Sequence, residues 1–149
     1  MARTPKERLV GQPPLFTTFK PAGIMGQKLE QVQLELDEYE AIRLADFEGL
    51  EHEEAAEAMG ISRSTFTRLI AKARRQVAIM LVDGAKLSIG GGNIRFREKF
   101  YRCLSCQHIF KNDELDEKVV CPKCKHEDIE SLSHKGGRNN SCHKDLVAQ

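Results

Sequence analysis

The chain has 149 residues, and its 23 basic and 22 acidic side chains give a formal net charge of only +1. It contains no run of about eighteen apolar residues and no apolar stretch behind its basic start, so we expect neither a membrane span nor a signal peptide, and we expect a cytoplasmic location. In that reducing compartment its five cysteines are expected to bind metal rather than to form disulfides.

The near-neutral balance hides two segments of opposite charge. Residues 30–57 hold eleven acids against the single base Arg43, a net charge of −10. Residues 58–82 hold five bases and no acid, a net charge of +5. The overall charge is therefore no argument against nucleic-acid binding, which depends on a local basic surface.

Residues 1–28 are predicted to form a basic arm outside the core. Prolines and glycines interrupt any long helix there. Five bases oppose the single acid Glu7, and they are Arg3, Lys6, Arg8, Lys20 and Lys28. Two interpretations remain open: an arm that lies along DNA, or a tail solvated by its own charges.

Residues 29–87 are predicted to form a mainly α-helical domain of three helices. The first begins at Asp37, because Asp37 and Glu40 have the form of a capping box, and it ends at Gly49. The second runs from about residue 51 to 59, with acids near its positive N-terminus. The third runs from Arg63 to about Val82 and is the longest.

The junction of the second and third helices is typical of a helix-turn-helix. Ala56 lets two helices approach closely, Gly60 can adopt a positive φ, and Ser62 can cap the next helix. The apolar residues of the third helix recur at three- and four-residue steps, which leaves its bases outside the apolar arc. An ordinary helical hairpin with a solvated basic face is the alternative, but the sharp segregation of charge favours a helix that enters DNA.

Residues 88–93 are predicted to be a glycine linker. The run Gly90–Gly92 lacks the Lys-Ser/Thr ending of a phosphate-binding loop and does not open a helix. Residues 94–101 then alternate apolar and charged side chains over their first positions, which predicts a strand that leads to Cys103.

Residues 94–132 are predicted to form a small β-rich zinc ribbon. Two Cys-x-x-Cys pairs are separated by fourteen residues, and they supply Cys103, Cys106, Cys121 and Cys124. We expect one zinc per chain; iron in the same four-sulfur cage and free thiols are the alternatives, and a redox-active dithiol is the rival for either pair alone. Because four cysteines close the coordination sphere, the spacing indicates a structural rather than a catalytic metal.

Residues 133–149 are predicted to be a flexible tail. It carries Cys142 beside His143, with His134 upstream. These residues form either a weak second metal site or sensing ligand, or simply an exposed thiol on a mobile segment.

The run from Leu36 to Leu50, followed by Glu53–Ala56 and Met59–Phe66, resembles the DNA-binding fourth region of bacterial sigma factors. More closely, the sequence from Arg3 to Gly91 is similar to a small uncharacterised prokaryotic family of predicted DNA-binding proteins built on that module. The resemblance implies a three-helix, sigma region-four-like fold and promoter-type reading of DNA, in which the third helix presents Arg63, Ser64, Thr67 and Arg68 to the groove.

Two departures from that module are visible. Glu51 stands where such modules often place a Ser or Thr cap. The chain also lacks every other sigma-factor region, so we do not expect it to recruit polymerase alone as a sigma factor. Residues 101–132 are similar to zinc ribbons in general, which implies a fold but no particular partner.

The sequence therefore predicts a DNA-binding transcription regulator that reads the major groove of double-stranded DNA with the helix starting at Ser62. Arg63 and Arg68 are expected to reach guanine edges, Ser64 or Thr67 other bases, and Lys72, Arg74, Arg75 and the arm are expected to contact phosphates. The acidic helices are expected to face away from the duplex, toward a basic partner surface such as RNA polymerase.

Different functions remain open beside that one. The protein could be a metal- or redox-sensing regulator, or a metal-delivery or maturation protein whose ribbon is the active part. The oligomeric state, the target sequence and the direction of regulation follow from no motif. An enzyme is not expected, because the chain shows no paired carboxylates in an apolar setting, no nucleophile with a placed base and no open metal position.

Overall fold

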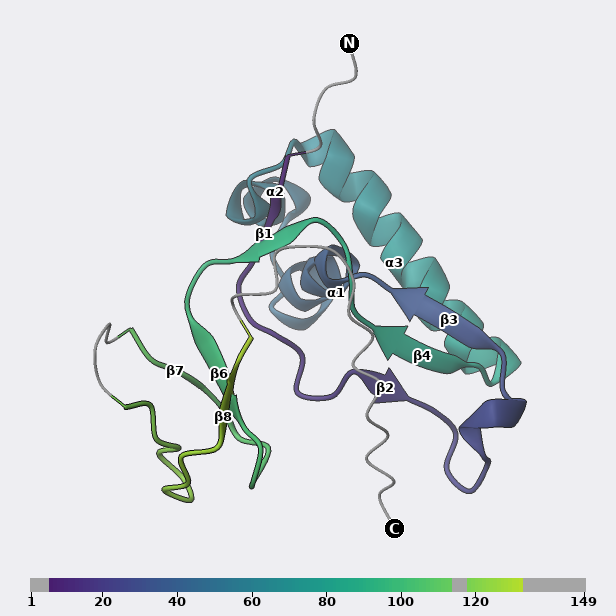
Figure 1. Ribbon diagram of the computed structural model, residues 1–149. Coiled ribbons are helices and arrows are strands. Elements are labelled where there is room, and N and C mark those ends of the chain that lie inside the picture. Colours follow the sequence, from purple (N-terminus) through teal and green to yellow (C-terminus); the bar gives the residue numbers. More distant parts are fainter. Residues whose placement is uncertain (1–5, 114–117, 133–149) are drawn as a thin grey trace.

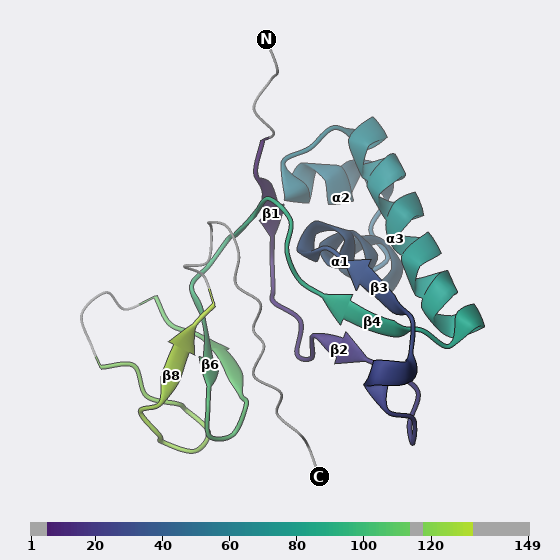
Figure 2. The ribbon, with the colours of Figure 1, turned by 45° about the vertical axis from the view of Figure 1, so that its right-hand side comes forward.

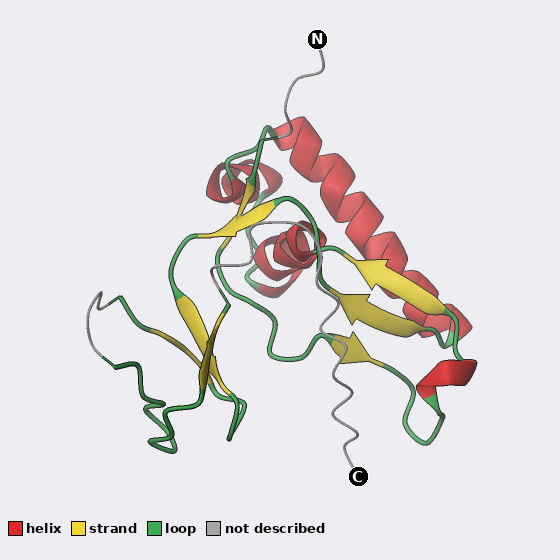
Figure 3. Cartoon of the chain, in the orientation of Figure 1, coloured by secondary structure: helices red, strands yellow, loops and turns green. Residues whose placement is uncertain are grey.

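The computed structural model describes residues 6–113 and 118–132, and within them three α-helices and three small sheets make a mixed α/β fold (Figures 1 and 3). In chain order the elements are β1 (Arg8–Val10), β2 (Thr18–Phe19), the 3-10 turn η1 (Gly26–Lys28), β3 (Gln31–Leu34), α1 (Leu36–Ile42), the π-helical turn η2 (Arg43–Phe47), α2 (His52–Met59), α3 (Arg63–Asp83), β4 (Lys86–Ile89), β5 (Ile94–Phe96), β6 (Phe100–Cys103), β7 (Ile109–Lys111) and β8 (Ile129–Ser131).

The long helix α3 forms one side of the molecule. Helices α1 and α2 pack on its first half, and the sheet of β2, β4 and β3 lies beside its second half (Figures 1 and 2). The sheet of β7, β6 and β8 lies on the side away from α3 in both views. Across the described ranges, no helix has the length and apolar character needed to cross a bilayer.

Helix α1 starts earlier than predicted, with Glu35 rather than Asp37 as its N-cap. The Glu38 carboxylate accepts a hydrogen bond from the Glu35 backbone N–H at 2.9 Å, which is the reciprocal bond of a capping box. Asp37 has another role, because its buried carboxylate pairs with Arg8 of β1. The acidic pattern is thus a true capping signal that we placed two residues too late.

The segment from α2 to α3 has the predicted bounds. Glu51 and Glu54 form a capping box without a Ser or Thr, and the Glu51 backbone N–H donates to the Glu54 carboxylate at 3.3 Å. Gly60 turns the chain with a φ of 68°, a conformation that favours glycine. Ser62 then caps α3, because its hydroxyl accepts a hydrogen bond from the Thr65 backbone N–H at 3.2 Å.

Two apolar clusters form the core, and α3 contributes to both. The first packs the three helices together through Ala41, Leu44, Ala55, Ala56, Met59, Phe66, Leu69 and Ile70. The second packs the sheet of β3 and β4 on the continuation of α3 through Val32, Leu34, Ala73, Ala85, Leu87 and Ile89. One helix therefore fixes the helical layer and the sheet to each other.

The sheet of β2, β4 and β3 shows that the region predicted to be mainly helical is mixed. Strand β4 pairs in parallel with β3 and antiparallel with β2. The predicted boundary at residue 87 and the predicted linker start at residue 88 are corrected, because β4 extends through Ser88 to Ile89 inside this sheet. Alternating burial along Val32–Leu34 and Leu87–Ile89 explains the pairing, since both strands turn apolar side chains to α3.

The predicted basic arm over residues 1–28 also needs correction where the structure describes it. Strand β1 pairs in parallel with β5, and Val10 is fully buried. Strand β2 pairs with β4. Strand β5, which we assigned to the ribbon, therefore belongs to the helical unit. Short pairings between segments this distant leave no local pattern in the sequence, which is why the parallel β1–β5 pair and the antiparallel β2–β4 pair were both missed.

The glycine run is not a free hinge. The Gly90 backbone N–H donates to the Leu34 carbonyl at 3.0 Å, and the Gly91 carbonyl accepts from the Leu36 backbone N–H at 3.2 Å. The Gln33 side-chain amide donates to the Gly90 carbonyl at 2.8 Å. These bonds attach the run to the end of β3 and the start of α1, and the positive φ of Gly91 and Gly92, 77° and 90°, explains the preference for glycine there.

Three carboxylates near the start of α1 are buried, with exposed fractions of 1–3%: Asp37, Glu38 and Glu40. Each pairs with a base from a different element, namely Arg8 of β1, Lys72 of α3 and Arg43 of η2. The Glu40 carboxylate also accepts from the Gly11 backbone N–H at 2.9 Å. Part of the predicted acidic outer face is thus interior, because these acids neutralise bases of the same chain.

We predict that Lys72→Ala lowers the free energy of unfolding by about 1–3 kcal/mol, because the buried Glu38 carboxylate would lose its cationic partner. The matched change Arg75→Ala, at an exposed position with no ion pair among the described residues, should alter it by less than about 0.5 kcal/mol. Urea denaturation of the full-length variants measures both values. Equal stability of the two variants would show that the Lys72–Glu38 pair contributes nothing.

Candidate metal centre and candidate nucleic-acid interface

The four predicted cysteine ligands come together at one point. Their Sγ atoms all lie within 4.8 Å of one another. Cys103 and Cys124 are 3.5 Å apart, and Cys106 and Cys121 are 3.6 Å apart. Sulfurs about 2.3 Å from a tetrahedral zinc would be separated by about 3.8 Å, so the cluster has the size of a four-cysteine metal site.

The two Cys-x-x-Cys turns have the same backbone design. In the first, the Cys103 N–H donates to the His108 carbonyl and the Gln107 N–H to the Cys103 carbonyl, both at 2.9 Å. In the second, the Cys121 N–H donates to the His126 carbonyl at 3.0 Å and the Lys125 N–H to the Cys121 carbonyl at 2.9 Å. The residue after each second cysteine has a positive φ, 62° at Gln107 and 64° at Lys125. These paired turns aim both sulfurs of each turn at a shared centre.

The acid–base properties of the cluster suit a divalent cation. Burial acts to raise the pKa of the Cys121 thiol, but hydrogen bonds from the Cys124 and Lys123 backbone N–H groups hold that pKa at about 6. A backbone hydrogen bond from His126 favours the Cys124 thiolate, yet burial and the neighbouring cysteines raise its pKa to about 12. One thiolate therefore forms readily and opposes the next, a repulsion that a bound cation would remove.

The four close cysteines could thus hold a metal ion such as zinc, on β6 and the loops that join β6, β7 and β8. Cys103 and Cys121 are buried, and Cys106 and Cys124 are half-buried. An ion there would tie β6 to the loop before β8. The other predicted candidates, His134, Cys142 and His143, lie outside the described residues.

The predicted DNA-contacting residues all lie on α3. Counted at about 100° per residue, the side opposite the apolar core is centred on Ser64, Arg68, Ala71 and Arg75, which are all exposed. Arg63 and Arg74 lie on one flank of this outward face, and Lys72 lies on the other. The structure therefore brings Ser64, Arg68 and Arg75 together and places the remaining predicted residues at the edges.

Several of these side chains have partners within the chain. Lys72 pairs with buried Glu38 at 2.6 Å, and Arg74 pairs with exposed Asp46 at 2.7 Å. The Thr67 hydroxyl donates to the Arg63 carbonyl at 3.0 Å and lies 3.1 Å from the His52 Nδ1 atom. Two of the five bases on the helix are thus neutralised locally.

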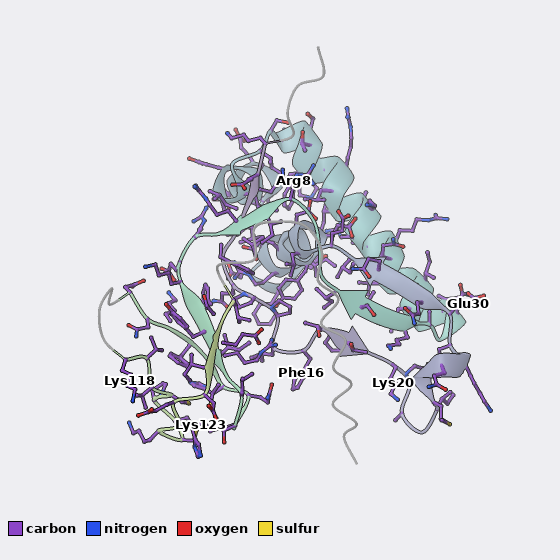
Figure 4. All side chains as sticks on the ribbon, in the orientation of Figure 1. Arg8, Phe16, Lys20, Glu30, Lys118 and Lys123 are labelled. Atoms are coloured by element: carbon purple, nitrogen blue, oxygen red, sulfur yellow. The ribbon has the colours of Figure 1, made fainter. Side chains whose placement is uncertain are left out.

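Arg8 is a candidate that we treated only as part of the arm. Strand β1 carries its side chain to the edge of α3, where a cleft of about 360 Å³ is lined by Arg8, Glu35, Thr65, Arg68, Leu69 and Lys72. Figure 4 shows Arg8 on the helical side of the molecule, away from Lys118 and Lys123 of the cysteine-bearing segment. The pairing of β1 with the distant β5 determines this position, and no local signal marks it.

Comparison with known proteins gives a family match and close relatives. Residues 1–97 match the family described as "Protein of unknown function DUF134". A UPF0251 protein of Pelotomaculum thermopropionicum is 46% identical over 124 residues, which cover 83% of this chain and 93% of that protein. A UPF0251 protein of Clostridium novyi is 37% identical over 145 residues, which cover 97% of this chain and 99% of that protein. No solved structure matches.

We predict that purified protein carries about one zinc per chain, and that Cys103→Ser combined with Cys121→Ser abolishes this binding, because together the two changes remove the buried ligand of each turn. Elemental analysis of both proteins measures the metal content. Cys142→Ser is the matched control and should retain the metal. A metal content that stays near one in the double variant would refute the assignment of these ligands.

Proposed function

We propose that the chain, which belongs to the DUF134 family, is a sequence-specific DNA-binding regulator of transcription that reads the major groove with α3. The observation that carries this proposal is the exposed side of α3, where Arg68 and Arg75 on the outward face and Arg63 on its flank have no ion pair among the described residues. Small side chains separate these arginines, so the face can approach base edges closely.

The geometry of α2 and α3 supports a helix-turn-helix. Gly60 and Ser62 make a short capped turn, and the capped first turn of α3 presents its positive dipole end and free N–H groups outward. Arg63, Ser64, Thr67 and Arg68 lie within the first six positions of α3, the part of a recognition helix that contacts bases. Arginine can bind guanine in a bidentate manner, whereas Ser64 and Thr67 suit other base edges.

The three helix bases that we propose for phosphate contacts differ in their partners within the chain. Arg75 is free to bind a phosphate, and Arg74 can exchange its exposed Asp46 partner at little expense, since exposed ion pairs contribute little stability. Lys72 is held by a buried carboxylate and would keep that partner when DNA binds. The salt-dependent part of the affinity would thus come mainly from arginines.

The exposed acids of α2 support the second proposed partner. Glu51, Glu53, Glu54 and Glu57 are all exposed, and they lie on the helix that precedes the recognition helix. They would repel a duplex and attract a basic protein surface, for which RNA polymerase is our proposed example.

For the cysteine cluster we propose one structural zinc. Bound zinc would supply folding free energy to a segment with little apolar core, and four cysteine ligands leave no position for a substrate. We therefore propose a binding protein rather than an enzyme.

We predict that Arg68→Ala weakens binding to the preferred DNA site by about 1–3 kcal/mol and relaxes the base preference at one position, because a bidentate contact is lost. Lys118→Ala, on the cysteine-bearing segment, is the matched change of charge and should leave affinity and preference unaltered. Selection from random duplexes followed by binding measurements at fixed salt tests this. Identical affinities of the wild type and an Arg63→Ala, Arg68→Ala variant for every duplex would refute the proposal.

A metal-responsive regulator is the second candidate, and the attachment of the ribbon favours it. The chain that enters β6 is fixed to the helical unit, because the Arg97 backbone N–H donates to the Val10 carbonyl at 3.1 Å and its guanidinium donates to the Ala58 carbonyl of α2. The Phe96 ring lies 6.1 Å from the Phe100 ring of β6. Loss of the metal could thus loosen β5 and, through it, β1.

For the structural zinc we predict that chelation melts the segment of β6, β7 and β8, since zinc contributes on the order of 10 kcal/mol to such units. DNA affinity at fixed salt should change less than about tenfold, because the α3 interface has its own core. The Cys103→Ser, Cys121→Ser variant is the control and should not respond to chelator. A larger change in the wild type alone would favour the metal-responsive regulator.

A further inference from the structure

The cleft between β1 and α3 brings three cationic side chains together from two elements. Arg8 comes from β1, and Arg68 and Lys72 come from successive turns of α3. Thr65 and Glu35 line the rim, and Leu69, which is 6% exposed, belongs to the apolar core below. This opening therefore has polar walls against an apolar cluster.

Two of these three cations, Arg8 and Lys72, are oriented by ion pairs with buried acids. Asp37 pairs with Arg8, and Glu38 pairs with Lys72 at 2.6 Å; both acids are buried. An arginine has five N–H donors and a lysine three, so one carboxylate leaves donors of each base free. Arg68 has no hydrogen bond or ion pair among the described residues, and its whole guanidinium is available.

We propose that this cleft is a binding site for a phosphate group. Its accessible charges are mainly cationic, because Asp37 and Glu38 lie behind the bases and only Glu35 reaches the lining. The three bases Arg8, Arg68 and Lys72 balance the three acids Glu35, Asp37 and Glu38, so these six groups are neutral together before a phosphate binds. Guanidinium and ammonium donors held in fixed positions are the groups that bind phosphate oxygens.

The position of the cleft agrees with a phosphate of DNA. Lys72 lies on one flank of the outward face of α3, and Arg63 and Arg74 lie on the other. A helix in the major groove has a phosphate backbone on each side, so Arg8 of β1 would contact the backbone on one of these sides. In this form the inference rests on the proposed DNA binding; a free phosphate compound would use the same donors without it.

The test uses the full-length metal-loaded protein and two probes, a random-sequence duplex and inorganic phosphate. The variant R8Q/D37N removes the Arg8 cation but keeps the net charge and leaves no unpaired buried acid. D37N alone keeps Arg8 and frees it, and K118Q removes one charge far from the cleft. Thermal unfolding confirms that each variant is folded.

With the duplex, R8Q/D37N should reduce the slope of log Kd against log salt by about one, and D37N should not reduce it. With inorganic phosphate, the amide signals of Thr65 and Arg68 should shift saturably in nuclear magnetic resonance titrations of the wild type and not of R8Q/D37N. Either result, the smaller salt slope or the saturable amide shift, locates a phosphate site in the cleft. Only the smaller salt slope identifies the phosphate as one of the duplex backbone.

The outcomes separate this inference from the proposed function. If R8Q/D37N leaves the slope equal to those of D37N and K118Q, and phosphate causes no saturable shift, the cleft is not a phosphate site even if α3 reads DNA. If the wild type prefers no duplex but phosphate saturates the cleft, DNA reading fails and the phosphate site remains.

Discussion

A buried carboxylate needs a cation, and this requirement ties β1, α1 and α3 to one another. Asp37 takes Arg8 from the N-terminal strand, and Glu38 takes Lys72 from the long helix. Because an unpaired buried charge is costly, displacing either element from α1 would cost the free energy of separating a buried acid from its cation. The arrangement of the proposed interface on α3, and of β1 beside it, follows from these pairs.

The same pairs change the meaning of the charge pattern in the sequence. The contrast between −10 over residues 30–57 and +5 over residues 58–82 suggests two opposed surfaces. In the structure, Lys72 and Arg74 of the basic segment instead neutralise Glu38 and Asp46 of the acidic one. What remains exposed on α3 is a small set of unpaired arginines. Recognition by such a surface, as we propose it, would rest on the planar geometry of guanidinium contacts more than on net charge.

Local signals predicted the parts of the fold that local interactions determine. Gly60 and Ser62 determined the turn into α3, and each Cys-x-x-Cys pair determined one turn of the sulfur cluster, because each of these turns depends on residues a few positions apart. The strands were harder, since β3 with β4 and β1 with β5 pair in parallel across the whole helical segment. The glycine run misled for a related reason: glycine occurs both in flexible linkers and in ordered segments with a positive φ, such as Gly91 and Gly92, and only the hydrogen bonds of Gly90 and Gly91 to distant residues identify an ordered segment.

The parallel pairing of β1 with β5 has a consequence for how the chain folds as it is synthesised. Arg8 is made early, yet its strand partner Ile94 emerges only after all three helices. The helical core is built from contacts between residues closer in sequence, so it can form first. Strand β1 can pair only after β5 has been synthesised. An element added last over so long a loop is expected to open at lower free energy than the core. Amide hydrogen exchange in the native protein should therefore find Leu9 and Val10 among the first strand amides to exchange, although Val10 is fully buried.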